Sequence, residues 1–316
     1  MYIGLDIGGS AVKGVLADGT GRVLGFSEIS TPAKISIFER DIIKLVDSLS
    51  VMASIGMNEI KCIGIGAAGS IDRKKGVIIK SANIGFLEGF NIVKKIENKT
   101  GVKTVLENDA TAAAMGAWWV EGGSRYSEWI LITLGTGIGG GLFTGNRIYT
   151  GSSGNSMEIG HMTIDYNGKR CNCGSRGCLE RYASATAIVE SAESLIRQYP
   201  SSSLTKRTMD EKISSRMIYE EAVKKDRLAI RVLNEASICL GCGVANLVNI
   251  FNPEAIFFGG GLSGAHKIMM PVVKKTVKKR IMPGMGKSIK YIVIKNFKRT
   301  PAIGAAKIAM DSVSKP

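Results

Sequence analysis

Apolar residues at the start of the chain fall into short runs that turn residues separate. The runs Tyr2 to Ile7, Ala11 to Ala17 and Arg22 to Ile29 each have the length of one strand. A glycine pair and the stretch Asp18 to Gly21 lie between them and supply the turns. The pattern therefore predicts a β-meander.

Helical and strand-like patterns alternate after this meander. Apolar residues at helical spacing extend from Ile37 to Ile55, a short apolar run from Cys62 to Gly66 is typical of a buried strand, and a second helix is expected near Ile92 to Lys99. The stretch Gly69 to Gly76 is predicted to be a loop. The first part of the chain is thus an α/β lobe.

The order of elements at the start recurs near residue 129. There the chain has WILITLGTGIGGGLFTGNRIYTG, which repeats the strands and turns of YIGLDIGGSAVKGVLADGTGRVLG. We interpret the recurrence as a diverged internal duplication. It predicts two similar lobes around a cleft that suits a small ligand. The lobes are placed at residues 1–110, completed by a helix at 301–316, and at 111–300.

The second part of the chain is rich in helices. Its longest apolar stretch, Ser237 to Gly261, is broken by polar residues, which favours a buried helix and a buried strand over a membrane span. Strands are expected at Ala255 to Phe258 and Tyr291 to Ile294. A last helix, Ala302 to Val313, is expected to pack back on the first lobe.

Composition and charge limit the classes of partner. With 316 residues, 45% of them hydrophobic, the chain is long enough for a substantial core and two lobes. The net charge is +15, and eleven Lys or Arg and no acidic residue lie between Lys267 and Arg299. Those lysines fall beside apolar residues that have helical spacing, which favours a solvated helix face over nucleic-acid binding. The start shows no secretory signal, so a cytoplasmic location and no membrane partner are expected.

A glycine-rich turn follows the predicted strand near residue 129. Gly135, Gly137 and Gly140 have the spacing of a dinucleotide-binding fingerprint, but that fingerprint needs a following helix. The segment Leu142 to Tyr149 predicts a hairpin instead, which excludes a Rossmann site. What remains is a turn that allows backbone N–H groups to approach an anion, with Thr136 as an added hydroxyl donor.

The first turn has similar chemistry. Gly8, Gly9 and Ser10 follow the first strand, so the two turns together would hold the phosphates of a nucleotide from opposite sides. Two ordinary hairpin turns are the alternative. Asp6, at the end of the same strand, is placed to hold a hydrated Mg²⁺ ion, although an aspartate near a turn often accepts a local hydrogen bond instead.

One imidazole and three thiols lie within eighteen residues on a loop rich in Gly, Asn and Lys. They are His161, Cys171, Cys173 and Cys178. This composition and spacing suit tetrahedral zinc, and disulfide pairing is disfavoured in a reducing compartment. Four protein ligands leave no open position, so we expect a structural Zn²⁺ ion that fixes the loop beside Glu158 and Glu180.

An apolar strand, Thr104 to Leu106, leads through Asn108 and Asp109 into a small-residue helix, Ala110 to Ala117. Asp109 therefore lies at a strand end in the predicted cleft. The residues alone favour Asp109 as the N-cap of the helix. A role as a general base that accepts a proton from a hydroxyl is compatible with that position.

Taken together, these motifs resemble those of the ROK group of sugar kinases and sugar-responsive repressors. The resemblance covers nearly the whole chain. It rests on DIGGS at the start, GAAGSID, ENDA, LGTGIGGG, EIGH and CNCGSRGCLE. It implies an α/β, two-lobed actin-like ATPase fold of the ribonuclease H-like type. Two departures are Ala68, where many members have Pro, and Ala11, where many have a polar residue.

The resemblance also implies roles for individual residues. Asp109 matches the catalytic base of such kinases, and His161 would contact zinc and sugar through different ring nitrogens. The residues implied to bind the sugar are Gly69, Asn83, Asn108, Asp109, Glu158, His161 and Glu180. Those implied to bind the nucleotide are Asp6, Gly8, Gly9, Ser10, Thr136, Gly137, Gly259 and Gly260.

The expected activity is transfer of the γ-phosphate of MgATP to the 6-hydroxyl of a hexose, with glucose as the first choice. N-acetylmannosamine and N-acetylglucosamine are alternative acceptors. A non-catalytic sugar sensor related to the repressors is a more distant alternative. It is disfavoured because Asp109 and both glycine turns are present, and because the first strand begins at Tyr2, which leaves no room for a winged helix. A dimer or tetramer is expected by the same resemblance.

Overall fold

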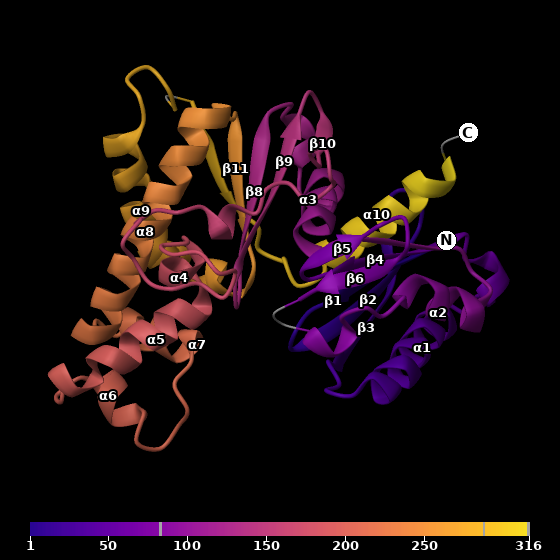
Figure 1. Cartoon of the computed structure of the whole chain (residues 1–316), viewed down its shortest axis with the longest axis horizontal. Coiled ribbons are helices and arrows are strands. Elements are labelled where there is room, and N and C mark those ends of the chain that lie inside the picture. The colour runs from indigo at the N-terminus through magenta and orange to yellow at the C-terminus, as the bar shows by residue number, and fades with distance from the viewer. Residues whose placement is uncertain (82–83, 287, 315–316) are drawn as a thin grey trace. The chain divides into compact units, whose positions relative to one another are not determined.

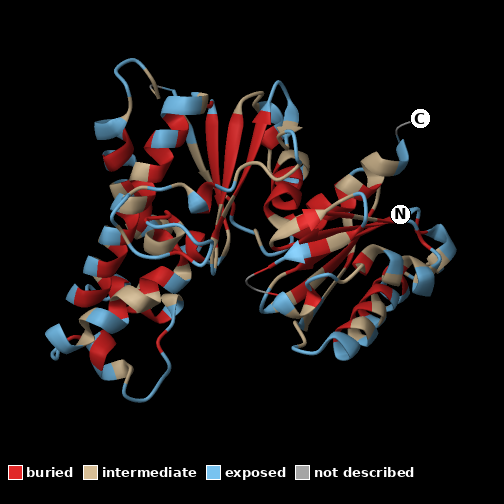
Figure 2. Cartoon of the chain, in the orientation of Figure 1, coloured by how far each residue is buried: buried red, intermediate tan, exposed pale blue. Residues whose placement is uncertain are grey.

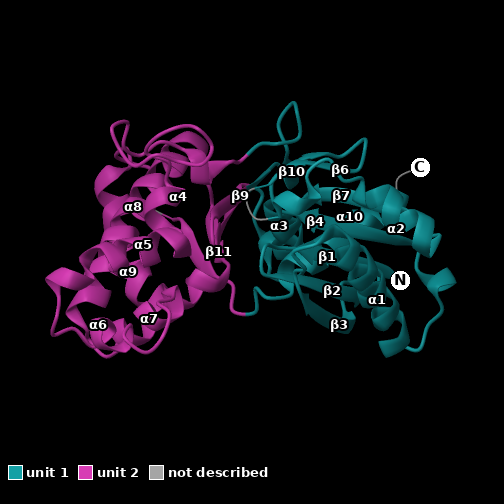
Figure 3. Ribbon diagram, turned by 60° about the horizontal axis from the view of Figure 1, so that its bottom comes forward, with its two compact units in different colours: residues 1–127, 141–156, 296–316 teal, residues 128–140, 157–295 magenta. Residues whose placement is uncertain are grey.

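The computed structural model describes residues 1–81, 84–286 and 288–314. Contacts between residues divide the chain into two compact units (Figure 3). Unit 1 contains Met1–Ser127, Gly141–Ser156 and Asn296–Pro316, and unit 2 contains Glu128–Gly140 and Met157–Lys295. The predicted domain boundary between residues 110 and 111 stays a prediction.

The first sheet has the strand order β3-β2-β1-β4-β7. Strands β1 (Tyr2–Ile7), β2 (Ala11–Ala17) and β3 (Val23–Ser30) pair antiparallel, so the predicted meander is confirmed. Strands β4 (Cys62–Ala67) and β7 (Thr104–Asn108) lie parallel to β1. The carboxyl ends of β1, β4 and β7 therefore meet at one edge of the sheet.

Helices cover both faces of this sheet. The side chains of each strand point alternately to one face and the other, because successive strand residues lie on opposite sides. On one face, aliphatic residues of the strands pack against α1 (Ile35–Met52) and α2 (Ile92–Thr100). On the other face, Tyr2, Val15 and Cys62 pack against α10 (Thr300–Ser314). Figure 2 shows the resulting pattern of buried strands and helices with exposed outer sides.

A short hairpin, β5 (Ser70–Asp72) and β6 (Val77–Lys80), follows β4. The prediction of a loop from Gly69 to Gly76 was therefore wrong for Ser70–Asp72, whereas residues 73–76 form a turn. Serine, aspartate and glycine are typical of turns, and β5 forms because a partner strand supplies its backbone hydrogen bonds. The pattern of apolar and polar residues in this segment does not indicate that β6 is its partner.

Glycines allow α10 to lie unusually close to β1 and β4. A Cβ atom built on Gly4 would lie 1.8 Å from the carbonyl oxygen of Ala302, and one on Gly64 would lie 1.9 Å from that of Ala305. The prediction that the last helix packs on the first lobe is thus confirmed, with a backbone-to-backbone contact that no larger residue permits.

The same helix is in close contact with α3 (Asp109–Val120). A Cβ on Gly304 would lie 1.7 Å from the carbonyl oxygen of Ala112, and one on Gly116 would lie 2.0 Å from that of Thr300. Small residues on both helices therefore set the position of α3, and with it the position of Asp109 at its start.

The second sheet has the order β10-β9-β8-β11-β12 and repeats the pattern of the first (Figure 1). Strand β11 (Ala255–Gly259) lies parallel to β8 (Trp129–Leu134) and to β12 (Lys290–Val293). Strands β9 (Ile138–Thr144) and β10 (Arg147–Tyr149) form an antiparallel hairpin. The recurrence seen in the sequence thus corresponds to a repeated sheet topology, and the predicted absence of a Rossmann helix after the glycine turn is confirmed.

The rest of unit 2 is mainly helical. Its helices are α4 (Glu180–Ala183), α5 (Ala185–Leu195), α6 (Ser203–Arg207), α7 (Ser215–Val223), α8 (Arg227–Phe251) and α9 (His266–Arg280). Helix α8 has the length and apolar composition of a membrane span, but 61% of its most apolar window is buried inside the protein. It is followed by β11, so the predicted buried helix and buried strand are confirmed.

Helix α9 carries much of the positive charge. Val273 and Val277 are buried, whereas Lys274, Lys275 and Lys278 are exposed. The lysines thus lie on a solvated helix face, as the spacing predicted. The absence of a nucleic-acid partner stays a prediction.

The contact of α10 with β4 gives a first testable prediction. Gly64→Ala places a methyl group against the Ala305 carbonyl, so it should lower the free energy of unfolding by about 1–3 kcal/mol or more. Gly19→Ala is the matched control, because a Cβ at that position would have no heavy atom within 4 Å. Chemical denaturation of both variants measures the difference, and equal stabilities would contradict the close contact.

Candidate functional site

In unit 1, the candidate residues collect at the carboxyl edge of the first sheet. The turn after β1 holds Gly8, Gly9 and Ser10, Gly69 follows β4, and Asn108 and Asp109 join β7 to α3. The parallel pairing of these three strands brings the segments together, at the edge where α/β sheets bind ligands. Asn83, another candidate, lies outside the described residues.

The first turn is held by two hydrogen bonds to the backbone of Gly8. The N–H of Gly8 donates to the carbonyl of Ala11 over 3.1 Å, and the hydroxyl of Thr31 donates to the carbonyl of Gly8 over 2.6 Å. Gly9 and Ser10 form the exposed tip of the turn. A turn of this kind presents backbone to an approaching anion.

Asp6 is buried, with 8% of the residue exposed, beside this turn. Its carboxylate lies 3.4 Å from Nζ of Lys13, the residue directly opposite on β2. Burial raises the pKa of Asp6, and the positive charge of Lys13 opposes the shift. The pair brings one negative and one positive group to the phosphate side of the edge.

Asn108, rather than Asp109, is the N-cap of α3. Its Oδ1 accepts hydrogen bonds from the N–H groups of Ala110 and Thr111, over 2.9 and 3.1 Å. The interpretation of Asp109 as the N-cap was therefore wrong, because the preceding residue already fills that role. Asp109 is the first residue of the helix, and one of its oxygens accepts from the N–H of Ala110.

In unit 2, the second glycine turn joins β8 to β9. The N–H of Gly135 donates to the carbonyl of Gly137 over 2.9 Å, and the hydroxyl of Thr186 donates to the carbonyl of Thr136 over 2.8 Å. Gly259 ends β11, the strand beside β8, and Gly260 follows it. A Cβ on Gly260 would lie 2.2 Å from the carbonyl oxygen of Leu134. The nucleotide candidates of this unit thus lie on adjacent strand ends.

Glu180 lies against the same glycine turn. Its Oε2 accepts a hydrogen bond from the N–H of Ile138 over 2.8 Å, and a Cβ on Gly137 would lie 2.3 Å from that oxygen. The carboxylates of Glu180 and Glu158 interact, since the charge of Glu180 adds to the desolvation that raises the pKa of Glu158, while His161 lowers it. Glu158 therefore has His161 and Glu180 as charged neighbours.

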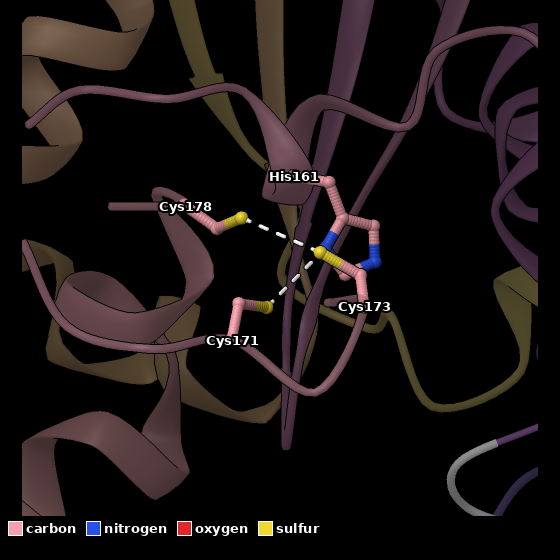
Figure 4. A group of neighbouring side chains, drawn as sticks. All are labelled: His161, Cys171, Cys173 and Cys178. Atoms are coloured by element: carbon pink, nitrogen blue, oxygen red, sulfur yellow. Dashed lines mark hydrogen bonds between the residues drawn. The ribbon is translucent and has the colours of Figure 1, made fainter. Parts of the chain in front are cut away.

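The ligand atoms of His161, Cys171, Cys173 and Cys178 lie within 4.8 Å of one another (Figure 4). The sulfurs of Cys173 and Cys178 are 3.6 Å apart, and Nδ1 of His161 lies 3.7 Å from the sulfur of Cys171. Zn–S bonds of about 2.3 Å place two sulfurs of a tetrahedral site about 3.8 Å apart. The spacing of the four groups therefore fits a tetrahedral zinc ion.

Three thiols this close together are difficult to ionise at the same time, because neighbouring thiolates repel one another. The N–H of Ser175 lowers the pKa of Cys173, whereas burial and the two neighbouring cysteines raise the pKa of Cys178 to about 12. A divalent cation removes this conflict because it stabilises all three thiolates. The donor chemistry thus agrees with the geometry.

The protein-family model described as the ROK family matches residues 2–312. The chain belongs to the ROK family. Glucokinase from Thermotoga maritima is 32% identical over 312 residues, with 98% of each chain covered. The crystal structure of a ROK family glucokinase from Streptomyces griseus in complex with glucose and AMPPNP matches with a TM-score of 0.87 and 30% identity, covering 98% of this chain and 99% of that one.

A repressor is also similar to this ROK protein. The xylose repressor of Bacillus spizizenii is 29% identical over 312 residues, and the match covers 98% of this chain and 77% of the repressor. The predicted family is confirmed, and so is the predicted α/β fold of the actin-like ATPases. Membership in the family does not by itself distinguish a kinase from a regulator.

Sequence reasoning missed two charged residues at the site of this ROK protein. Arg73, in the turn of the β5–β6 hairpin, forms a two-pronged ion pair with Glu107, which directly precedes Asn108. Glu107 is part of the ENDA motif, but its role depends on a residue thirty-four positions earlier. The motif therefore marked the position without indicating the partner.

Proposed function

We propose that this ROK protein is an ATP-dependent hexose kinase of the glucokinase type, which transfers the γ-phosphate of ATP to the 6-hydroxyl of glucose. The observation that carries the proposal is the match over 98% of both chains to a glucokinase, together with the structural match to a glucokinase bound to glucose and AMPPNP. These matches confirm the prediction of an ATP-dependent hexose kinase.

Asp109 is the proposed general base. It begins α3 at the carboxyl edge of the first sheet, and its helix is capped by Asn108, so its carboxylate is not required for capping. Accepting the proton of the attacking hydroxyl as the phosphoryl group arrives would typically contribute about a hundred- to ten-thousand-fold to the rate.

The glycine turns are the proposed phosphate sites. Gly8, Gly9 and Ser10 serve in unit 1, and Thr136 and Gly137 serve in unit 2, with the nucleoside near Gly259 and Gly260. Backbone N–H groups in turns stabilise phosphate charge without reorganising during the reaction. Magnesium bound with ATP would neutralise further phosphate charge, and the buried carboxylate of Asp6 is suited to hold its hydration shell.

The proposed sugar residues are Gly69, Asn83, Asn108 and Asp109 in unit 1 and Glu158, His161 and Glu180 in unit 2. Amide and carboxylate groups suit vicinal hydroxyls because they accept and donate in pairs. Nδ1 of His161 faces the cysteines, which leaves Nε2 for a sugar hydroxyl. The sugar and the metal cluster would therefore share one imidazole.

We propose a structural zinc ion on His161, Cys171, Cys173 and Cys178. Its role would be to fix the loop from His161 to Cys178, and hence Glu180, because four protein ligands leave no site for substrate. The loop has few apolar residues of its own to hold it, so the metal would supply the missing cross-links.

Acceptor choice separates the proposed glucokinase from its alternatives. Kinases for N-acetylmannosamine or N-acetylglucosamine need room at the second carbon of the sugar. A non-catalytic sensor would bind sugar without turnover. Homo-oligomer formation and a cytoplasmic location stay predictions from the sequence.

A coupled ADP-release assay tests the acceptor. With MgATP, glucose should give a kcat/KM at least about tenfold above those of N-acetylmannosamine and N-acetylglucosamine, because an added acetyl group must find space in the pocket. A preference for an N-acetyl sugar would contradict the assignment of glucose as the acceptor. Thermal stabilisation by a sugar without turnover would favour a non-catalytic sugar sensor.

Asp109→Asn tests the base. The variant should lose about two to four orders of magnitude in kcat while its melting temperature and its affinity for glucose stay close to those of the parent chain. Asp41→Asn, at an exposed ion pair on α1, is the matched control and should keep full activity. Near-normal turnover of Asp109→Asn would exclude the assignment.

Metal analysis of the purified protein tests the zinc proposal. The parent chain should contain about one zinc ion per chain, and Cys173→Ser should lose most of it and unfold at a lower temperature, because a hydroxyl replaces a thiolate ligand. Cys239→Ser, which alters a thiol outside the four-residue group, should retain the metal. Equal zinc contents in the two variants would rule out the site.

A further inference from the structure

An ion pair in unit 1 links two segments of the candidate sugar site. Nε of Arg73 donates to Oε2 of Glu107 over 2.8 Å, and Nη2 of Arg73 donates to Oε1. The two side chains are only 25% and 11% exposed. Two parallel N–H···O contacts fix the direction of a guanidinium as well as its distance, so this pair defines a geometry.

The turn that carries Arg73 is itself rigid. The N–H of Gly76 donates to the carbonyl of Asp72 over 2.8 Å, and the N–H of Lys75 donates to the Asp72 carboxylate over 3.0 Å. A Cβ on Gly76 would lie 2.5 Å from the Cβ of Val93 on α2, so the turn is also packed against a helix. Arg73 therefore extends from a fixed base.

Glu107 connects Arg73 to the end of β7. Its Oε1 accepts a hydrogen bond from the N–H of Asn108 over 2.7 Å. Asn108 in turn caps α3, whose first residue is Asp109. The carboxylate of Glu107 thus holds both the guanidinium and the backbone at the point where the proposed base begins.

A second link closes a ring around β5. Nδ2 of Asn108 donates to the carbonyl of Gly69 over 3.3 Å, at the start of the hairpin, whereas Arg73 lies at its far end. The chain from Gly69 to Arg73 is therefore tied to Glu107 and Asn108 at both ends. Movement of the hairpin requires movement of the strand end that precedes Asp109.

Arg73 also contacts a third segment, the loop that follows β10. A Cβ on Gly154 would lie 2.2 Å from Nη1 of Arg73, and Gly154 has φ +83°, a conformation that glycine adopts without strain. The guanidinium thus approaches this backbone through Nη1, while Nε and Nη2 donate to Glu107.

We infer that Arg73 and Glu107 are a positioning pair that aligns Asn108 and Gly69 for the sugar and Asp109 for its hydroxyl. The inference rests on the proposed kinase function. Neither side chain needs to touch a substrate. Their effect is exerted through Asn108, so the pair should matter for the sugar and the chemical step and little for ATP.

Steady-state kinetics of Arg73→Gln and Glu107→Gln test this inference. Each should raise KM for glucose and lower kcat, with a combined loss in kcat/KM of about ten- to hundredfold, since misplacement by about 1 Å costs on the order of a hundredfold. KM for ATP should change less than about threefold. A loss of folding alone would lower active protein without shifting one KM selectively.

The double variant and a conservative variant sharpen the result. If the two residues act as a unit, Arg73→Gln with Glu107→Gln should lose about as much as either single change, not the product of both losses. Arg73→Lys keeps the charge but not the fork, so it should recover only part of the loss. Losses that multiply, or full recovery by lysine, would overturn the pairing.

Arg207→Gln is the matched control. Arg207 also pairs with glutamates, Glu211 and Glu220, and its side chain is 30% exposed, but it lies on α6 outside the candidate site. It should lower stability while leaving both KM values unchanged. Glucose KM values of Arg73→Gln and Glu107→Gln equal to that of the parent chain would overturn the inference.

Failure of the proposed function gives a different result. If the parent chain turns over no hexose, calorimetry with glucose replaces the assay, and both single variants should then bind glucose about tenfold or more weakly than the parent. Equal glucose affinities would overturn the inference, and so would a parent chain that neither binds nor phosphorylates any of the tested hexoses.

Discussion

The backbone contact between helix α10 and the first sheet is the constraint on which the geometry of unit 1 depends. Gly4 and Gly64 let the helix lie directly on β1 and β4, and Gly304 lets it lie directly on α3. Dense contacts of this kind allow few alternative arrangements, since any shift would separate or overlap backbone atoms. The last residues of the chain thus determine where α3 begins.

Asp109, the proposed general base, is the first residue of α3. Parallel pairing of β1, β4 and β7 brings a phosphate-type turn, a sugar-type amide and a carboxylate to one edge. The ion pair of Arg73 and Glu107 then fixes details that the sheet leaves open, because it ties a hairpin to the strand end. In unit 2, Glu180 accepts a hydrogen bond from the N–H of Ile138 beside the second glycine turn, and it follows Cys178 of the four-residue metal-type cluster by two positions.

The relation to repressors shows how little of the fold is specific to catalysis. A xylose repressor is similar over 98% of this chain, so the sheets and their order are compatible with either role. Within the proposed kinase, the chemistry is assigned to a few groups, namely Asp109 and the two glycine turns. The fold positions these groups, but their chemistry decides between catalysis and sensing.

The sequence by itself determined the meander, its repetition, the buried character of α8 and the zinc-type cluster, because these depend on short-range periodicity and spacing. It also marked Asp109, through a motif. Only the tertiary structure decided that Asn108 caps α3, that β5 is a strand and that Arg73 pairs with Glu107. Strand β5 and the ion pair depend on partners in other segments of the chain, which the local sequence does not name. The cap depends on which of two adjacent polar residues has the extended backbone conformation, and this residue is Asn108.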